Sequence, residues 1–169
     1  MKYRSINELS KFEYHDAIIE KFEFMQGNLI VEVSGINITT ANPQNTFEKD
    51  MCTHKANIIF EGATVEKIII SGYESLDSDM KLIEKVADVE VKKEEYNSIF
   101  DNAEGAYGHI SSMEILTKLE DGKYQICFCI DAYHIGWYYL TLVFERGIVE
   151  WDEFNGEAWY EHETWKKER

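Results

Sequence analysis

The chain has 169 residues, of which 44% are hydrophobic and 14% aromatic. This composition supplies apolar surface for one well-packed core and excludes a chain that is disordered throughout. The 17 basic and 32 acidic residues give a formal net charge of -15. Such an acidic surface repels polyphosphate and anionic lipid, so we expect no nucleic-acid partner and no membrane partner. The charge favours either plain solubility or attraction to a basic protein partner.

Two features of the sequence predict a cytoplasmic protein with reduced thiols. No apolar run approaches the ~20 residues that a membrane-spanning helix needs, and the first residues are charged throughout, unlike a secretion signal. The three cysteines, Cys52, Cys127 and Cys129, are an odd number without the spacing of a disulfide-stapled domain.

Alternating apolar and polar residues predict short strands in the N-terminal half. Residues 17–25 and 28–40 alternate on either side of a glycine-containing turn, which is typical of a hairpin. Residues 41–55 contain the only proline among small polar residues, which predicts a surface loop. Residues 56–71 are rich in β-branched side chains, and Gly62 divides them into two short strands.

The middle of the chain has the weakest pattern. Residues 72–108 are polar and acidic, with two amphipathic pieces at 79–86 and 93–101. In the second piece Tyr96 and Ile99 stand at helical spacing, so we predict a short helix there.

Four strands are predicted in the C-terminal half, at residues 110–119, 124–130, 137–145 and 148–154. Asp121-Gly122 separates the first two strands and is a strong signal for a tight hairpin turn, because both turn positions need positive φ. Arg146-Gly147 predicts a second turn, after which the chain returns beside the preceding strand. The two middle strands are apolar on both faces, which is typical of the centre of a sheet.

These elements predict a mainly β domain. Eight or nine short antiparallel strands with one or two short helices fit a sandwich or a partly closed barrel, formed by residues 1–169 as a single domain. The structural alternative is an α+β sheet covered by residues 79–100. The oligomeric state has no sequence signal.

No sequence motif assigns a catalytic residue or a cofactor. The chain has no nucleophile elbow, no catalytic-cysteine signature and no phosphate-binding loop. Cys127 and Cys129 would share one face of a strand, and Cys52 and His54 offer two further zinc ligands. The usual zinc knuckle is Cys-x2-Cys in a turn, so the mid-strand pair favours buried packing over a metal site.

The candidate binding residues concentrate near the C-terminus, where carboxylates interleave with tryptophan and tyrosine. Tryptophan and tyrosine anchor many protein interfaces, and carboxylates steer a basic partner. This pattern assigns a binding surface to His134, Glu150, Trp151, Asp152, Trp159 and Tyr160.

The same region has two other interpretations. A small enzyme or ligand-binding barrel would point at least two carboxylate or histidine side chains into a deep pocket. The candidates for that pocket are Asp131, His134, Glu150 and Asp152. In the plainer interpretation the aromatic residues fill the core and the carboxylates form its solvated face.

One short motif resembles a known class of proteins. Tyr14-His15-Asp16-Ala17, followed by an alternating strand, a glycine-containing turn and a second strand, resembles the opening of small bacterial domains of uncharacterised function. Some similar domains occur among the immunity proteins of polymorphic toxin systems. The resemblance implies no catalytic residue and no cofactor, and it favours a cytoplasmic protein that occludes its partner with an oppositely charged surface.

His15 and Asp16 also have a simpler structural interpretation. An adjacent His-Asp pair needs further ligands from other elements to hold a metal, and here it directly precedes a strand. We therefore predict that one of the two residues bonds to backbone where the strand begins and fixes a turn.

Overall fold

The computed structural model describes residues 1–105 and 107–162. Within these residues the protein has sixteen strands, one α-helix and three short 3-10 helices. The predicted mainly β, antiparallel architecture with short helices is confirmed, but the strands outnumber the eight or nine predicted. The additional strands are two to five residues long. Pieces of this length are too short to show the alternation on which a sequence pattern depends.

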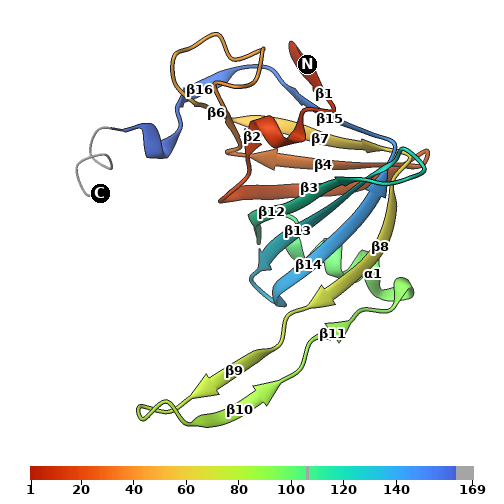
Figure 1. Ribbon diagram of the computed structural model, residues 1–169, viewed down its shortest axis with the longest axis vertical. Coiled ribbons are helices and arrows are strands. Elements are labelled where there is room, and N and C mark those ends of the chain that lie inside the picture. The colour runs from red at the N-terminus through yellow and green to blue at the C-terminus, as the bar shows by residue number, and fades with distance from the viewer. Residues whose placement is uncertain (106, 163–169) are drawn as a thin grey trace.

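Ten strands form one antiparallel sheet (Figure 1). Across the sheet the order is β1 (Tyr3–Ile6), β15 (Arg146–Trp151), β7 (Lys55–Glu61), β4 (Asn28–Ser34), β3 (Ala17–Met25), β12 (Gly108–Lys118), β13 (Tyr124–Ala132), β14 (Gly136–Phe144), β8 (Thr64–Ile70) and β11 (Val89–Glu90). Strands β1 and β11 lie at the two edges, so the sheet is open and does not close into a barrel.

The two halves of this sheet face each other across the hydrophobic core. Strand β7 belongs to one half, and strands β13 and β14 belong to the other. The Phe60 ring of β7 lies 5.8 Å from Phe128 of β13 and 4.9 Å from Phe144 of β14, edge to face in both cases. All three rings are at most 3% exposed. The packing is that of a sandwich, which is one of the two architectures that the strand pattern predicted.

The two predicted hairpins are present. Strands β3 and β4 pair around Gln26 and Gly27, which both have positive φ. Strands β12 and β13 pair on either side of Asp121-Gly122. This second connection is a wider loop than the dipeptide predicted: only Gly122 has positive φ, and the Leu119 N–H donates to the Lys123 carbonyl oxygen at 2.7 Å.

The turn predicted at Arg146-Gly147 does not form a hairpin. Strand β15 leaves β14 and pairs with β7 and β1 in the other half of the sheet. The Glu145 N–H donates to the Glu61 carbonyl oxygen at 2.8 Å, and Arg146 forms an ion pair with Glu61. A glycine marks a bend in the chain, whereas the partner strand is selected by packing between distant residues.

A second sheet of four strands covers one end of the core. Its order is β16 (Phe154–Glu157), β6 (Met51–Thr53), β5 (Asn37–Ile38) and β2 (Phe12–Glu13). The rings of Phe12 and Phe154 lie 5.7 and 6.1 Å from the ring of Trp151 in β15. The segment 41–55, predicted as a loop, therefore contains a strand that belongs to this cover.

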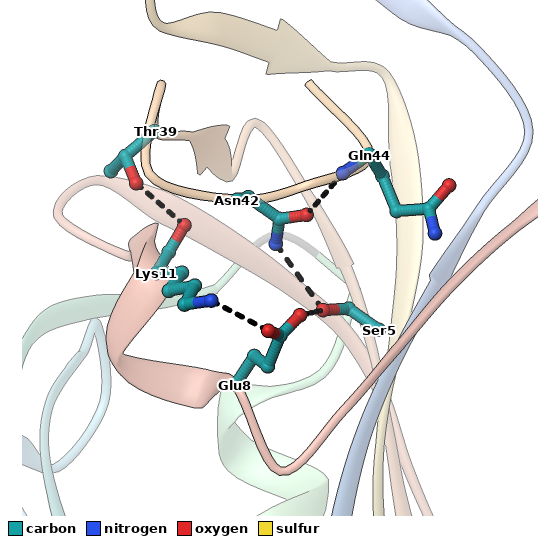
Figure 2. A network of polar contacts seen from close by, with 6 residues as sticks. All are labelled: Ser5, Glu8, Lys11, Thr39, Asn42 and Gln44. Carbon is teal, nitrogen blue, oxygen red and sulfur yellow. Dashed lines mark hydrogen bonds and ion pairs between the residues drawn. The ribbon is translucent and has the colours of Figure 1, made fainter. Parts of the chain in front are cut away.

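Polar side chains fix the connection between β5 and β6 to the N-terminal segment (Figure 2). The buried Asn42 donates from Nδ2 to Ser5 Oγ at 3.3 Å and accepts the Gln44 N–H at 3.0 Å. Ser5 Oγ donates to one carboxylate oxygen of Glu8 at 2.6 Å, and the Lys11 ammonium donates to the other oxygen at 2.6 Å. Specific side chains therefore hold this loop in place.

Helix α1 (Tyr96–Ala103) follows the 3-10 helix η2 (Lys93–Glu95), close to the helix predicted at 93–101. It contacts β3, β12 and β13, and its Phe100 ring lies 4.7 Å from Phe22 of β3. The other two 3-10 helices are η1 (Leu9–Lys11) and η3 (Trp159–Glu161).

Among the described residues, no helix has both the length and the apolar character needed to cross a membrane.

Strands β9 (Tyr73–Leu76) and β10 (Leu82–Val86) form a separate two-stranded ribbon. We call this ribbon, residues 73–86, the arm, and the rest of the molecule the body. The arm extends away from the body (Figure 1). The amphipathic piece at 79–86 belongs to the arm and does not cover the sheet, so the α+β alternative is not the observed fold.

Candidate functional site

The predicted binding residues near the C-terminus do not share one surface. Trp151 is fully buried, and its ring stacks on Tyr3 with 5.3 Å between the ring centroids. Its Nε1 has no hydrogen-bond partner within residues 1–105 and 107–162. Trp151 therefore belongs to the core between the two sheets and is not accessible to a partner.

The two carboxylates next to Trp151 hold the N-terminal segment. Glu150 forms an ion pair with Arg4 of β1 at 3.3 Å. Asp152 accepts the backbone N–H of Lys2 at 2.8 Å. Both carboxylates therefore have a structural role that needs no partner protein.

Trp159 and Tyr160 lie together on η3. The Tyr160 hydroxyl donates to Asp50 Oδ2 at 2.9 Å. Burial, aided by the Asp50 carboxylate, raises the pKa of Tyr160 above its usual range, so the hydroxyl remains protonated and keeps donating. The Trp159 ring is 40% exposed and packs edge to face against Tyr160 with 5.4 Å between centroids.

His134 lies in a different part of the body, in the turn between β13 and β14 (Figure 1). Its ring lies 5.0 Å from Tyr133 and 5.5 Å from Tyr107. Asp131 lines a hollow close by, together with Tyr107 and His109. The structure therefore brings His134 together with exposed tyrosines and separates it from Trp159 and the other candidates.

The arrangement does not support a deep pocket that combines the predicted carboxylates and histidines. Asp131 lies on β13 and Glu150 on β15, which are five positions apart in the sheet order. Between the two halves of the sheet lies an apolar void of about 10 Å³, lined by residues such as Phe22 and Phe128. A void of this size is at the lower limit for one water molecule, and its apolar lining offers no polar contact to a ligand.

The Tyr14–Ala17 motif joins the start of β3 to β12. Asp16 has a φ of 65°, and its N–H donates to the Ile110 carbonyl oxygen at 3.0 Å. The His15 Nδ1 lies at hydrogen-bond distance, 2.7 Å, from the Ser111 carbonyl oxygen. These backbone contacts account for the pair without a metal ion.

The three thiols are divided between the two sheets. Cys127 and Cys129 lie on the same face of β13, and Cys52 lies on β6. In the part of the chain that the structure describes, no group of three or more histidine, cysteine, aspartate or glutamate side chains is placed to hold a metal ion. Burial raises the pKa of each of the three thiols, which disfavours the reactive thiolate.

The arm exposes large apolar side chains that the core does not use. Six such residues are each between 38% and 75% exposed: Tyr73, Leu76, Met80, Leu82, Ile83 and Val86. Leu76 and Leu82 are directly paired across the two strands, so they lie on one face of the ribbon. Tyr73 and Val86 form a second such pair on the other face of the ribbon. Exposed large apolar side chains gathered on one small element are typical of an interaction surface.

Polar contacts within the arm give it a defined shape. The Lys85 ammonium of β10 forms an ion pair with Glu74 of β9 at 2.5 Å. At the tip, Asp77 Oδ1 accepts the backbone N–H groups of Asp79 and Lys81 at 2.8 and 2.9 Å. The arm is therefore an ordered hairpin whose own side chains stabilise its turn.

The base of the arm lies beside the turn between β13 and β14 (Figure 1). The Ser71 N–H donates to the Trp137 carbonyl oxygen at 2.8 Å. At Gly72 the two backbone segments that form the base of the arm approach closely. A Cβ atom on residue 72 would lie 2.1 Å from the Val86 carbonyl oxygen. Glycine is the residue that permits this approach. The arm and the β13–β14 turn therefore share one end of the molecule.

Sequence reasoning missed both the arm and the exposed tyrosines. Residues 73–76 and 82–86 flank the turn residues Asp77-Ser78-Asp79, but neither piece alternates apolar and polar residues, so the strand signal is missing. The second piece fits an amphipathic helix, and a local pattern does not show whether an apolar face is covered. Tyr107 and Tyr133 stand in loops, where no periodicity distinguishes a surface tyrosine from a core tyrosine.

Comparison of the chain with protein-family models, with curated protein sequences and with solved structures finds no match.

Proposed function

We propose that this protein is a non-catalytic, acidic protein-binding domain that engages a basic partner protein through the arm. The observation that carries the proposal is the exposure of six large apolar side chains on a ribbon outside the body. Burying such surface against a partner is favourable by roughly 25 cal/mol per Å² of apolar area. The arm offers this surface in an ordered shape, so little conformational entropy is lost when it binds.

The charge of the arm favours a partner of opposite charge. Residues 73–86 contain four acidic and two basic residues, a net charge of -2, within a chain whose formal charge is -15. A second copy of this chain carries the same charge and is repelled. A basic protein with an apolar recess is attracted at long range and buries the arm at short range.

The specific form of the proposal is a cytoplasmic immunity-type inhibitor of a bacterial toxin. Its support is the resemblance of the Tyr14–Ala17 motif, the acidic charge and the projecting arm. A protein that blocks a concave site needs an element that reaches into it, and a narrow ribbon with exposed apolar side chains has that shape.

The test compares two doubly substituted proteins. Leu76→Ser with Leu82→Ser removes the paired apolar face of the arm. Ile6→Ser with Met25→Ser is the matched control, because these two side chains are 45% and 50% exposed but lie on the body. Each protein is immobilised, and proteins from a lysate of the cells that carry the gene are captured at low and high salt and measured by quantitative mass spectrometry.

We expect wild type and the control to retain one basic protein at low salt, and the arm variant to lose it. Capture should weaken at high salt, because ions screen the attraction between exposed charges. If the arm variant retains the same proteins as the control, or no basic protein is captured at low salt, the proposal is contradicted.

A further inference from the structure

The end of the body next to the base of the arm carries a shallow hollow of about 370 Å³, here called the aromatic hollow. Its lining residues are Tyr107, His109, Asp131, Ala132, Tyr133 and Gly136. Of the residues singled out in the sequence, Asp131 lines this hollow, and His134 packs against its tyrosines Tyr107 and Tyr133. Its chemistry differs from that of the arm because a carboxylate lies among aromatic rings.

Asp131 is in the middle of a row of side chains that crosses three strands. It is paired with His109 of β12 on one side and with Trp137 of β14 on the other. The next residues along each strand, among them Ile130 and Tyr138, point into the core and are buried. The row therefore faces away from the core, toward solvent.

Asp131 is half-buried, and its carboxylate has no hydrogen bond or ion pair with any described residue. Other carboxylates at the edges of the body have such partners: Glu150 binds Arg4, and Glu61 binds Arg146. A carboxylate that is partly withdrawn from water favours a cation beside it. Asp131 is thus a charged group whose partner is not supplied by the described part of the chain.

Exposed aromatic rings surround this carboxylate. Tyr107, Tyr133 and Trp137 are 54%, 81% and 53% exposed. The backbone holds the first two in place, because the Tyr133 N–H donates to the Tyr107 carbonyl oxygen at 2.8 Å. At Gly108 a Cβ atom would lie 2.8 Å from the Ala103 carbonyl oxygen, so this glycine lets β12 begin directly against the end of α1.

We propose that the aromatic hollow binds an arginine side chain of the partner protein, with the guanidinium group stacked on a tyrosine ring and hydrogen-bonded to the Asp131 carboxylate. A planar guanidinium satisfies both surfaces at once, because it is attracted to the face of an aromatic ring and donates in a fork to a carboxylate. The ammonium group of lysine is a strongly hydrated point charge and lacks the planar stack. An anionic ligand is repelled by Asp131 and by the net charge of the chain.

The assignment of this arginine to a protein partner rests on the proposed function. The Ser71–Trp137 backbone bond of 2.8 Å links the segment before the arm to β14 next to Gly136 of the aromatic hollow, so the two features lie at the same end of the molecule. In such an interface the arm supplies apolar area and the aromatic hollow supplies a charge-specific anchor.

The binding step is tested with two short peptides, acetyl-Gly-Arg-Gly-amide and the same peptide with citrulline in place of arginine. Citrulline has nearly the same shape without the positive charge. Backbone amide signals of the isotopically labelled full chain are recorded by NMR as each peptide is added. We expect the arginine peptide to shift the signals of residues 107–109 and 131–137 in a saturable way and the citrulline peptide to leave them unchanged.

Two variants test the residues of the hollow. Asp131→Asn should lower the affinity for the arginine peptide about tenfold, and Tyr133→Ala should also lower this affinity.

Equal shifts from the two peptides, no saturable shift, or unchanged affinity of the Asp131→Asn variant would overturn the proposal. Amide signals outside these residues report whether each variant keeps its fold. The arm variant with Leu76→Ser and Leu82→Ser separates this proposal from the proposed function. This variant should bind the arginine peptide like wild type. If it also captures the same proteins from the lysate as wild type, only the proposed role of the arm is contradicted. If wild type fails to bind the arginine peptide, only the proposal for the aromatic hollow is contradicted.

Discussion

The body and the arm are both built from paired antiparallel strands that carry large apolar side chains, but these side chains are buried in the body and exposed in the arm. In β7 and β13 the apolar face is covered by the other half of the sheet, and Phe60 and Phe128 are at most 3% exposed. In β9 and β10 nothing in the described chain covers the apolar face, and Leu76 and Leu82 are 44% and 56% exposed. The difference lies in the presence of a second layer.

The residues that stabilise the fold and the residues proposed to bind a partner lie in separate parts of the molecule. The body has a connected core that includes residues from both halves of the ten-stranded sheet. The arm contributes no residue to that core. An isolated two-stranded ribbon is marginally stable in water, so an arm of this kind gains most when a partner covers it. Changes in the two regions should therefore have different consequences.

The largest difference is expected between Phe60→Ala in the body and Leu82→Ala in the arm. Phe60 fills the centre of the core, and its removal should lower the free energy of unfolding by about 3–5 kcal/mol. Leu82→Ala should change it by no more than about 0.5 kcal/mol, because the side chain is exposed. Urea denaturation followed by circular dichroism measures both values. A similar loss from the two substitutions would show that the arm is part of the cooperative core.

A smaller loss is expected from Asn45→Ala in the loop that closes the body. The buried Asn45 Nδ2 donates to the carbonyl oxygens of Ile38 and Lys49 at 2.9 and 3.0 Å. Its removal leaves polar backbone groups without a partner, which should cost about 1–3 kcal/mol of unfolding free energy. Gln44→Ala is the control, because the Gln44 side chain points away from the polar network (Figure 2). Equal melting temperatures of the two variants would contradict the role assigned to Asn45.

Gly72→Ala should affect the arm and spare the body. The added Cβ would lie 2.1 Å from the Val86 carbonyl oxygen, so the base of the arm must open. Amide hydrogen exchange should become faster across residues 73–86, while the strands of the body keep their protection. Ser78→Ala at the exposed tip is the control and should leave exchange unchanged. Unaltered exchange in the Gly72→Ala protein would mean that the base tolerates the added methyl group.

The smallest effect is expected from Glu8→Gln, and it should depend on pH. Hydrogen bonds from Lys11 and Ser5 hold the pKa of the Glu8 carboxyl below its usual value of 4.5. A pKa lowered in the folded state stabilises the protein above the unfolded pKa, and this contribution disappears as the pH falls through the folded pKa. The Glu8 side chain is 26% exposed, so the loss at neutral pH should be under about 1 kcal/mol. Urea denaturation at neutral pH and at about pH 3 should show the difference between wild type and variant shrinking in acid. A difference that is equal at both pH values would contradict this role.

Several elements of the fold were predictable because their signals are local. The β3–β4 hairpin, the β12–β13 hairpin and the short helix near Tyr96 follow from alternation, turn glycines and helical spacing. The interior positions of β13 and β14 follow from their two apolar faces. The pairing of β15 was not predictable, because the signal at Gly147 is a bend and the partner strand β7 lies some ninety residues earlier in the chain.

The candidate site was predicted only in part. Alternation and composition drew attention to Trp151 and Asp152, but the first is buried against Tyr3 and the second binds the Lys2 N–H. His134 was singled out from its loop position, and it lies against the rings of Tyr107 and Tyr133. A tryptophan beside a carboxylate has the same local sequence whether it fills a core or anchors an interface, so burial alone separates the two cases.

By itself, the sequence determined the strand periodicity, the acidic charge and the absence of a known catalytic motif, because each of these depends on residues that are close together or simply counted. Only the tertiary structure decided which apolar faces are covered. It folded one sheet over on itself, buried Trp151, left the arm exposed and placed Asp131 among Tyr107, Tyr133 and Trp137. The physical reason is that burial requires a second surface, and that surface comes from residues that are distant in the chain.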